Sequence, residues 1–202
     1  MPALRLRWLP LRNVLWTLAR AWLLCLCLIS AVKAEGIELR DLRVENQTES
    51  DSLVLQGDAL IELHPRLEEA INRGLPLYFV LEVEITRGRW YWFDEKAAQA
   101  SQTYRLSFNA LTRQYRVSVG GLQLRFSTLS EAFGFITRIR SLKLVERSQL
   151  QPNRSYAFSV RLRLDINQLP KPFQINALTE REWNLSSGWQ RFTYTPSEPA
   201  NK

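Results

Sequence analysis

The single histidine of this sequence is the first candidate for acid–base or metal chemistry. His64 directly precedes Pro65 at the start of a helical pattern, and both cysteines, Cys25 and Cys27, lie in an apolar N-terminal run. One histidine without cysteine partners excludes the usual zinc ligand sets, and a Ser-His-Asp triad would depend on this residue alone. We therefore interpret His64 as a helix-capping or surface residue, and we expect no metal site and no cofactor.

A pair of glutamates has the spacing of a hydrolase site. Glu82 and Glu84 alternate in a β-like run, which places both carboxylates on one strand face, about 6.5–7 Å apart. A carboxylate pair at that separation is the minimum requirement for glycosidase acid–base chemistry. Alternating glutamates are more typical of a solvated strand face, so we assign no catalytic residue and keep a carboxylate-dependent hydrolase of glycans as the alternative. The sequence also has no calcium-loop spacing and no glycine-rich phosphate loop.

A run of four aromatic residues is the strongest candidate for a binding surface. If Trp90-Tyr91-Trp92-Phe93 forms a strand, Trp90 and Trp92 share one face. Tryptophans that stay partly exposed could stack on a sugar ring, a peptide or a partner protein. The alternative is that the second sheet and a helix cover both faces, which would make these rings part of the core.

Two arginines form a basic row on another predicted strand. Arg161 and Arg163 flank Leu162, so both point away from the apolar face of that strand. They could meet anionic components of the cell envelope. The interpretation that we favour is a cross-strand ion pair with Glu82 or Glu84.

The first 34 residues have the pattern of an export signal. An uncharged run covers residues 21–32, and Val32-Lys33-Ala34 offers small residues at the positions that a signal peptidase reads. We expect a signal peptide at 1–34, one domain at 35–195 and a polar tail at 196–202. The run is shorter than the ~20 residues of a membrane-spanning helix, but an uncleaved anchor stays open as an alternative. In both cases the residues after Ala34 cross the membrane, because four arginines precede the run: Arg5, Arg7, Arg12 and Arg20.

Removal of this leader changes the charge and the cysteine content. Five of the 27 basic residues precede Glu35, which leaves 22 basic residues against 20 acidic ones and a net charge of +2. A basic nucleic-acid-binding face is therefore not expected. Without Cys25 and Cys27 the exported chain has no disulfide and no thiol chemistry, so its hydrophobic core must stabilise it.

Alternating apolar and polar residues predict an antiparallel β domain with eight or nine strands. The spacing changes to helical at 65–73, and Thr128-Leu-Ser-Glu131 has the form of a capping box, so we expect two short helices. Residues 94–102 are polar and are predicted to be a loop, and two prolines exclude a central strand at 169–172. The predicted fold class is mainly β, an antiparallel β-sandwich that is Ig-like in general architecture.

Four segments resemble one family of exported bacterial proteins, the DUF4390 family. They are Trp90-Tyr-Trp-Phe-Asp-Glu-Lys96, residues 104–116, residues 169–178 and Glu182-Trp-Asn-Leu-Ser-Ser187. The resemblance covers nearly all of the chain after the leader and implies a Gram-negative periplasmic protein. It assigns no catalytic or binding residue, because the family has no assigned function. It also suggests a partner, a membrane sensor kinase of the nitrogen-regulation type.

These observations together predict a non-catalytic periplasmic binding domain that contacts a membrane sensor or another envelope protein. The candidate binding residues are Trp90, Trp92, Arg161 and Arg163. We expect no nucleic-acid partner, and membrane contact only through residues 21–32 if the leader stays uncleaved. The alternatives are the hydrolase with Glu82 and Glu84 and a passive structural module.

Overall fold

The computed structural model describes residues 36–47, 50–88 and 95–197. The chain divides into two compact units, Met1–Lys33 and Ala34–Lys202, and all described residues belong to the second. None of the helices among these residues has the length and apolar character to cross a membrane.

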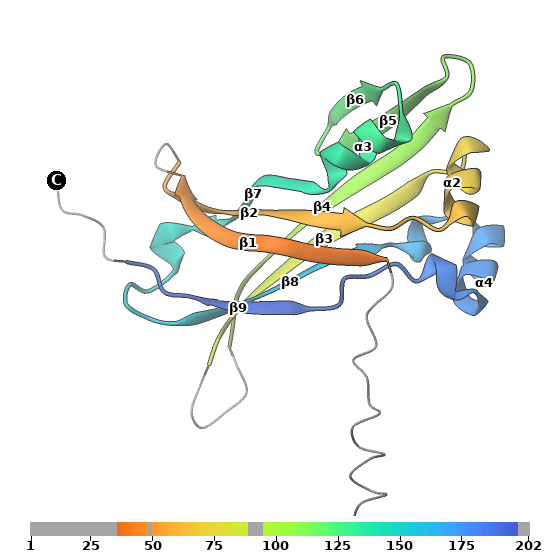
Figure 1. Cartoon of the computed structure of the whole chain (residues 1–202). Coiled ribbons are helices and arrows are strands. Elements are labelled where there is room, and N and C mark those ends of the chain that lie inside the picture. The colour runs from red at the N-terminus through yellow and green to blue at the C-terminus, as the bar shows by residue number, and fades with distance from the viewer. Residues whose placement is uncertain (1–35, 48–49, 89–94, 198–202) are drawn as a thin grey trace, which may run out of the picture. The chain divides into compact units, whose positions relative to one another are not determined.

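Two antiparallel sheets form the framework of the domain (Figure 1). This confirms the predicted mainly β, two-sheet class. The small sheet has the order β1 (Ile37–Gln47), β2 (Ser52–Ile61) and β7 (Arg138–Glu146). The large sheet has the order β6 (Leu122–Phe126), β5 (Gln114–Val119), β4 (Glu95–Asn109), β3 (Leu77–Arg87), β8 (Tyr156–Leu164) and β9 (Gln190–Tyr194).

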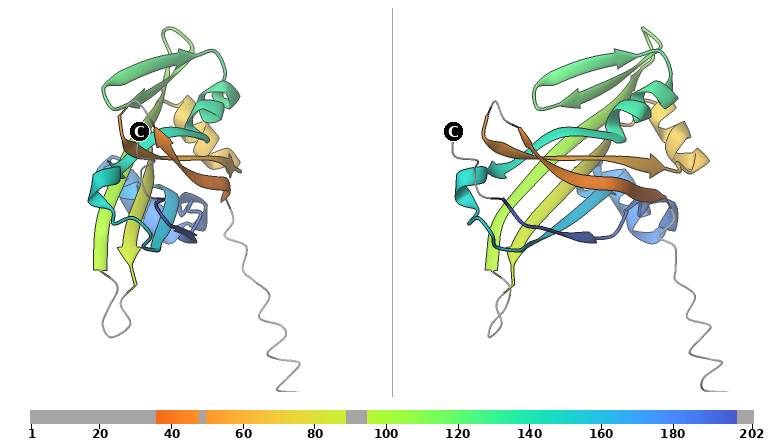
Figure 2. Two further views of the ribbon diagram at one scale, coloured as in Figure 1. Left: turned by 90° about the vertical axis from the view of Figure 1, so that its left-hand side faces the viewer. Right: turned by 60° about the vertical axis from the view of Figure 1, so that its left-hand side comes forward.

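The core lies between the sheets, where the small sheet crosses one face of the large one (Figure 2). Every second residue of β3 from Leu77 to Ile85 is at most 1% exposed, which defines the inner face of the large sheet. Leu53 and Leu55 of β2 are fully buried on the opposite side of this core. Among the described residues the buried core extends from Ile37 to Leu185, so the second unit has a hydrophobic core of its own, as an independently folding domain requires.

Two helices cover the rest of the inner face, and both begin as the sequence predicts. His64 is the N-cap of α2 (Pro65–Asn72), where its Nδ1 accepts a hydrogen bond of 3.3 Å from the Arg66 backbone N–H. Thr128 and Glu131 form a complete capping box at the start of α3 (Leu129–Ile136). The helix-capping interpretation of His64 is therefore confirmed.

The structure contains a third helix and a long strand that the sequence did not predict. α4 (Lys171–Thr179) begins at the two prolines. Pro172 is tolerated in the first turn of this helix because the backbone N–H groups of a first turn have no hydrogen-bond partner inside the helix. β4 begins at Glu95, so the predicted loop at 94–102 is wrong. Small alanines, Ala98 and Ala100, face inward there, and the long pairing with β3 rather than local hydrophobicity makes this segment a strand.

Three short 3-10 helices connect the elements near the C-terminus. They are Arg147–Gln149, Ile166–Gln168 and Arg181–Trp183.

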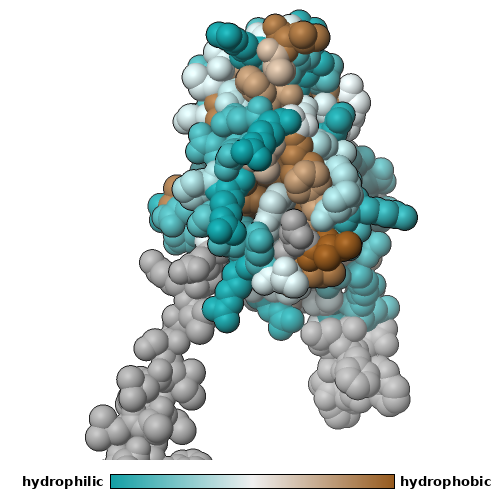
Figure 3. Space-filling model, turned by 90° about the vertical axis from the view of Figure 1, so that its right-hand side faces the viewer, coloured by the Kyte–Doolittle hydropathy of each residue, from teal (hydrophilic) through white to brown (hydrophobic). Residues whose placement is uncertain are grey.

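Apolar side chains reach the surface at one side of the domain, where α2, α4 and the β4–β5 turn lie (Figure 3). The turn residue Leu111 is 97% exposed, and Ile175 and Leu178 of α4 are 69% and 76% exposed. Exposed leucines scattered singly are ordinary on protein surfaces.

Candidate functional site

The polar candidates of the sequence meet on the outer face of the large sheet. Glu82 on β3 lies directly opposite Arg161 on β8, and Arg163 lies opposite Val80. The neighbouring inward positions are buried apolar residues, so strand alternation fixes these charged side chains on the outer face.

A single carboxylate binds both arginines. Arg161 donates to Oε2 of Glu82 from Nε at 2.9 Å and from Nη2 at 2.5 Å. Arg163 donates to Oε1 from Nε at 3.2 Å and from Nη2 at 2.9 Å, and its Nη1 is 3.1 Å from Asp165 Oδ1. The predicted cross-strand pairing is confirmed, with Glu82 as the acceptor. Glu84 instead accepts from Lys96 Nζ at 3.1 Å in a more exposed pair.

The network changes the acidity of its members. Partial burial raises the pKa of the Glu82 carboxyl, but hydrogen bonds and positive charge from Arg163 and Arg161 outweigh burial and bring that pKa below its usual range. The pKa of Asp165 is lowered in the same way, by Gln168 and Arg163 against its burial. The hydrogen bond to Glu82 raises the pKa of Arg163. All these groups are therefore charged at neutral pH.

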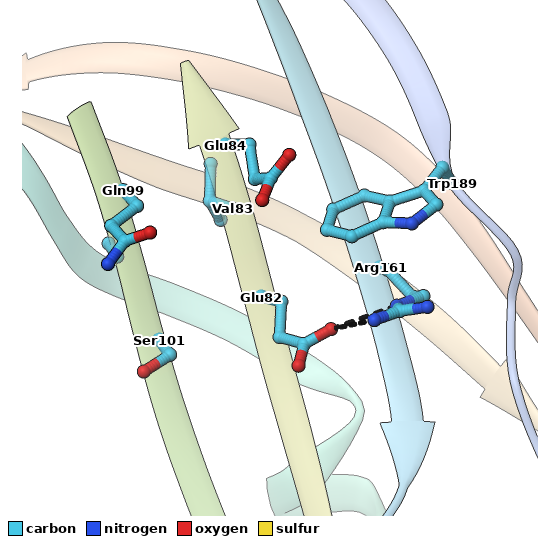
Figure 4. Close-up of a pocket in the computed structure, with 8 residues that line it drawn as sticks. Glu82, Val83, Glu84, Gln99, Ser101, Arg161 and Trp189 are labelled. Carbon is cyan, nitrogen blue, oxygen red and sulfur yellow. Dashed lines mark hydrogen bonds and ion pairs between the residues drawn. The ribbon is translucent and has the colours of Figure 1, made fainter. Parts of the chain in front are cut away.

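An exposed tryptophan completes the site. Trp189 directly precedes β9, and its ring lies over the guanidinium of Arg161, with 4.4 Å between Arg161 Cζ and the ring centroid (Figure 4). The ring is 39% exposed. Beside it is a shallow pocket of about 340 Å³. Its polar and aromatic lining consists of Glu82, Glu84, Gln99, Ser101, Arg161 and Trp189.

A family model described as a domain of unknown function (DUF4390) matches residues 34–193. The chain belongs to the DUF4390 family. The match contains the whole outer-face site and both sheets except the last residue of β9. No curated protein and no solved structure shows significant similarity to the chain.

Glu82 is not arranged as a general acid at this DUF4390 site. A glycosidase acid is a carboxyl whose pKa is raised so that it holds a proton at neutral pH, whereas the pKa of Glu82 is lowered. Its two oxygens already accept four hydrogen bonds, so neither is available to a substrate proton. Within the described part of the chain, no group of three or more His, Cys, Asp or Glu residues could hold a metal ion.

The candidate binding residues of the sequence separate into two groups in this DUF4390 domain. Arg161 and Arg163 lie at the site, but as partners of Glu82 rather than as a free basic row. Trp90 and Trp92 lie outside the described residues, so their binding role stays a prediction. Trp189, which directly precedes β9, was missed as a binding candidate. Its position over Arg161 depends on the pairing of β9 with β8, which no local pattern reveals.

Proposed function

We propose that this DUF4390 protein is an exported, non-catalytic binding domain of the periplasm. Its partner contacts the outer face of the large sheet at Trp189. The observation that carries the proposal is the half-exposed Trp189 ring on Arg161 beside a polar pocket. Tryptophan and arginine are the residues most enriched where binding energy concentrates in protein interfaces.

The site also matches the chemistry of a protein partner. Glu82 and Asp165 neutralise Arg161 and Arg163, so the surface around Trp189 has no strong net charge that would select a polyanion. The ion pairs hold the guanidinium under the tryptophan ring, so little side-chain entropy is lost on binding. A pocket of about 340 Å³ accepts one or two side chains. A membrane sensor kinase or another envelope protein is the partner class that we propose.

Export is tested by the mass of the protein in a periplasmic extract. Cleavage after Ala34 is expected to leave a chain that begins at Glu35, with both cysteines removed. A membrane-bound chain of full length would instead support the uncleaved anchor. Full-length protein folded in the cytoplasm would contradict export altogether.

Replacing Trp189 by alanine is expected to weaken partner binding by about 30-fold, because truncation of a hot-spot tryptophan costs about 2 kcal/mol or more. Stability is expected to fall by only about 1 kcal/mol, since the ring is partly exposed and stacks on one cation. Titration of the partner and chemical denaturation measure the two effects. Phe173→Ala on α4 is the matched control, because Phe173 is 38% exposed but lies outside the pocket, and equal binding losses in both variants would contradict the proposal.

A further inference from the structure

We propose that a second surface, the β4–β5–β6 end of the large sheet, binds the phosphate groups of an anionic lipid membrane. The surface consists of Arg105 on β4, Arg116 on β5 and Arg125 on β6, and we call it the arginine face. Strand alternation places Arg105 and Arg116 on the outer face, because Tyr104, Leu106 and Val117 are buried, and Arg125 shares this face because it lies opposite Arg116. This surface is separate from the Trp189 pocket and does not depend on it.

The register brings these arginines close together. Arg116 lies directly opposite Arg125, and Arg105 lies opposite Ser118, two residues along β5 from Arg116. Like charges directly opposite each other destabilise a sheet. The sequence offers no compensation nearby, because no Asp or Glu occurs between Lys96 and Glu131. The arrangement therefore has a cost for folding that a negatively charged ligand would remove.

No partner for these guanidinium groups is present in the described part of the chain. Neither a salt bridge nor a side-chain hydrogen bond joins Arg105, Arg116 or Arg125 to a residue described there, in contrast to the arginines at Glu82. The Nε of Arg116 is buried and has no hydrogen-bond acceptor there. Arg105 and Arg125 are exposed, and their guanidinium groups match phosphate oxygens, which accept two parallel hydrogen bonds from one arginine. The chemical class that this surface recognises is therefore a phosphate-bearing anion.

The tip of the same hairpin favours a membrane as the source of that phosphate. β4 and β5 are joined by a turn in which Leu111 is 97% exposed and Arg113 follows two residues later. Figure 3 shows apolar surface at this end of the domain, with hydrophilic surface beside it. An apolar side chain next to cations is the arrangement that inserts into the interface of an anionic bilayer while the cations contact lipid phosphates. A soluble acidic segment would give Leu111 no comparable contact.

The test uses the domain from Glu35 onward, which keeps the whole hydrophobic core. Its binding to phosphatidylcholine vesicles with and without phosphatidylglycerol is measured by co-flotation. We expect binding only with phosphatidylglycerol, and less of it at high salt. Arg105→Gln, Arg116→Gln and Arg125→Gln combined should weaken it about 100-fold, since each arginine near a membrane contributes about fivefold. Leu111→Ser should also weaken it.

The control is a second triple variant with the same change in net charge. Arg40, Arg43 and Arg73 are exposed and each is paired with a glutamate, so their replacement by glutamine should leave vesicle binding nearly unchanged. Denaturation should show that the arginine-face triple variant is as stable as the unmodified domain or more stable, because like charges are removed. Equal losses in both triple variants, or binding that ignores phosphatidylglycerol, would overturn the proposal. Failure to bind vesicles while an acidic peptide binds would overturn it too and assign the arginine face to a protein.

Discussion

Replacement of Phe79 by alanine is expected to lower the free energy of unfolding by about 4 kcal/mol, within the range for phenylalanine truncation in a core. Phe79 is fully buried at the middle of the core, and its ring meets the edge of Phe133 from α3 at 5.7 Å between centroids. The loss combines the transfer energy of the ring with the cost of the cavity that it leaves. Urea denaturation followed by tryptophan fluorescence measures the change.

The control for this variant is Leu111→Ala. Leu111 is 97% exposed, so its truncation should change the free energy of unfolding by less than about 0.5 kcal/mol. A Phe79→Ala domain as stable as this control would show that the two sheets do not enclose the core described above.

Replacement of Glu82 by glutamine is expected to cost about 3 kcal/mol of stability, because it leaves the partly buried guanidinium of Arg161 without a counter-charge and Arg163 with Asp165 alone. Glu84→Gln on the same strand is the matched control. Its pair with Lys96 is more exposed, so its loss should cost less than about 1 kcal/mol. Similar costs for both variants in urea denaturation would contradict the network at Glu82.

The ion pairs at Glu82 should also make the stability of the domain depend on pH. The pKa values of Glu82 and Asp165 are lower in the folded domain than in the unfolded chain. Each carboxylate therefore contributes stability at neutral pH, and this contribution is lost as the pH falls below the pKa of the unfolded chain, which is 4.5 for Glu82. The free energy of unfolding should therefore decrease as the pH falls below about 4.5. The Glu82→Gln variant should show a smaller decrease than the unmodified domain over the same range, and an identical pH dependence would contradict the assigned shift.

The sequence predicted the features that depend on neighbours in the chain. His64 before Pro65 and Thr128 with Glu131 are local capping signals, so two helix starts were found correctly. Strand alternation placed Arg161 on a polar face, and charge complementarity then indicated a glutamate partner. Which glutamate binds it depends on the register between β3 and β8, where Glu82 rather than Glu84 lies opposite Arg161.

The features that were missed depend on contacts between distant segments. The first half of β4 has no large apolar side chain on its inward face, where Ala98, Ala100 and Gln102 lie, so its strand character comes from its pairing with β3. Trp189 lies more than 20 residues from Arg161 in the sequence and meets it only because β9 is the neighbour of β8. The candidate site therefore could not be found without the sheet order, which a pattern of single strands does not contain.

The most direct test of the binding-domain account is site-specific photo-cross-linking in living cells. A cross-linking amino acid replaces Ser101, which lines the pocket beside Trp189, and in a control it replaces Leu60, which is exposed on the small sheet. The account predicts a discrete protein adduct in the periplasm from position 101 that disappears with Trp189→Ala, and no such adduct from position 60. Adducts that form equally at both positions, or that persist without the tryptophan, would contradict it.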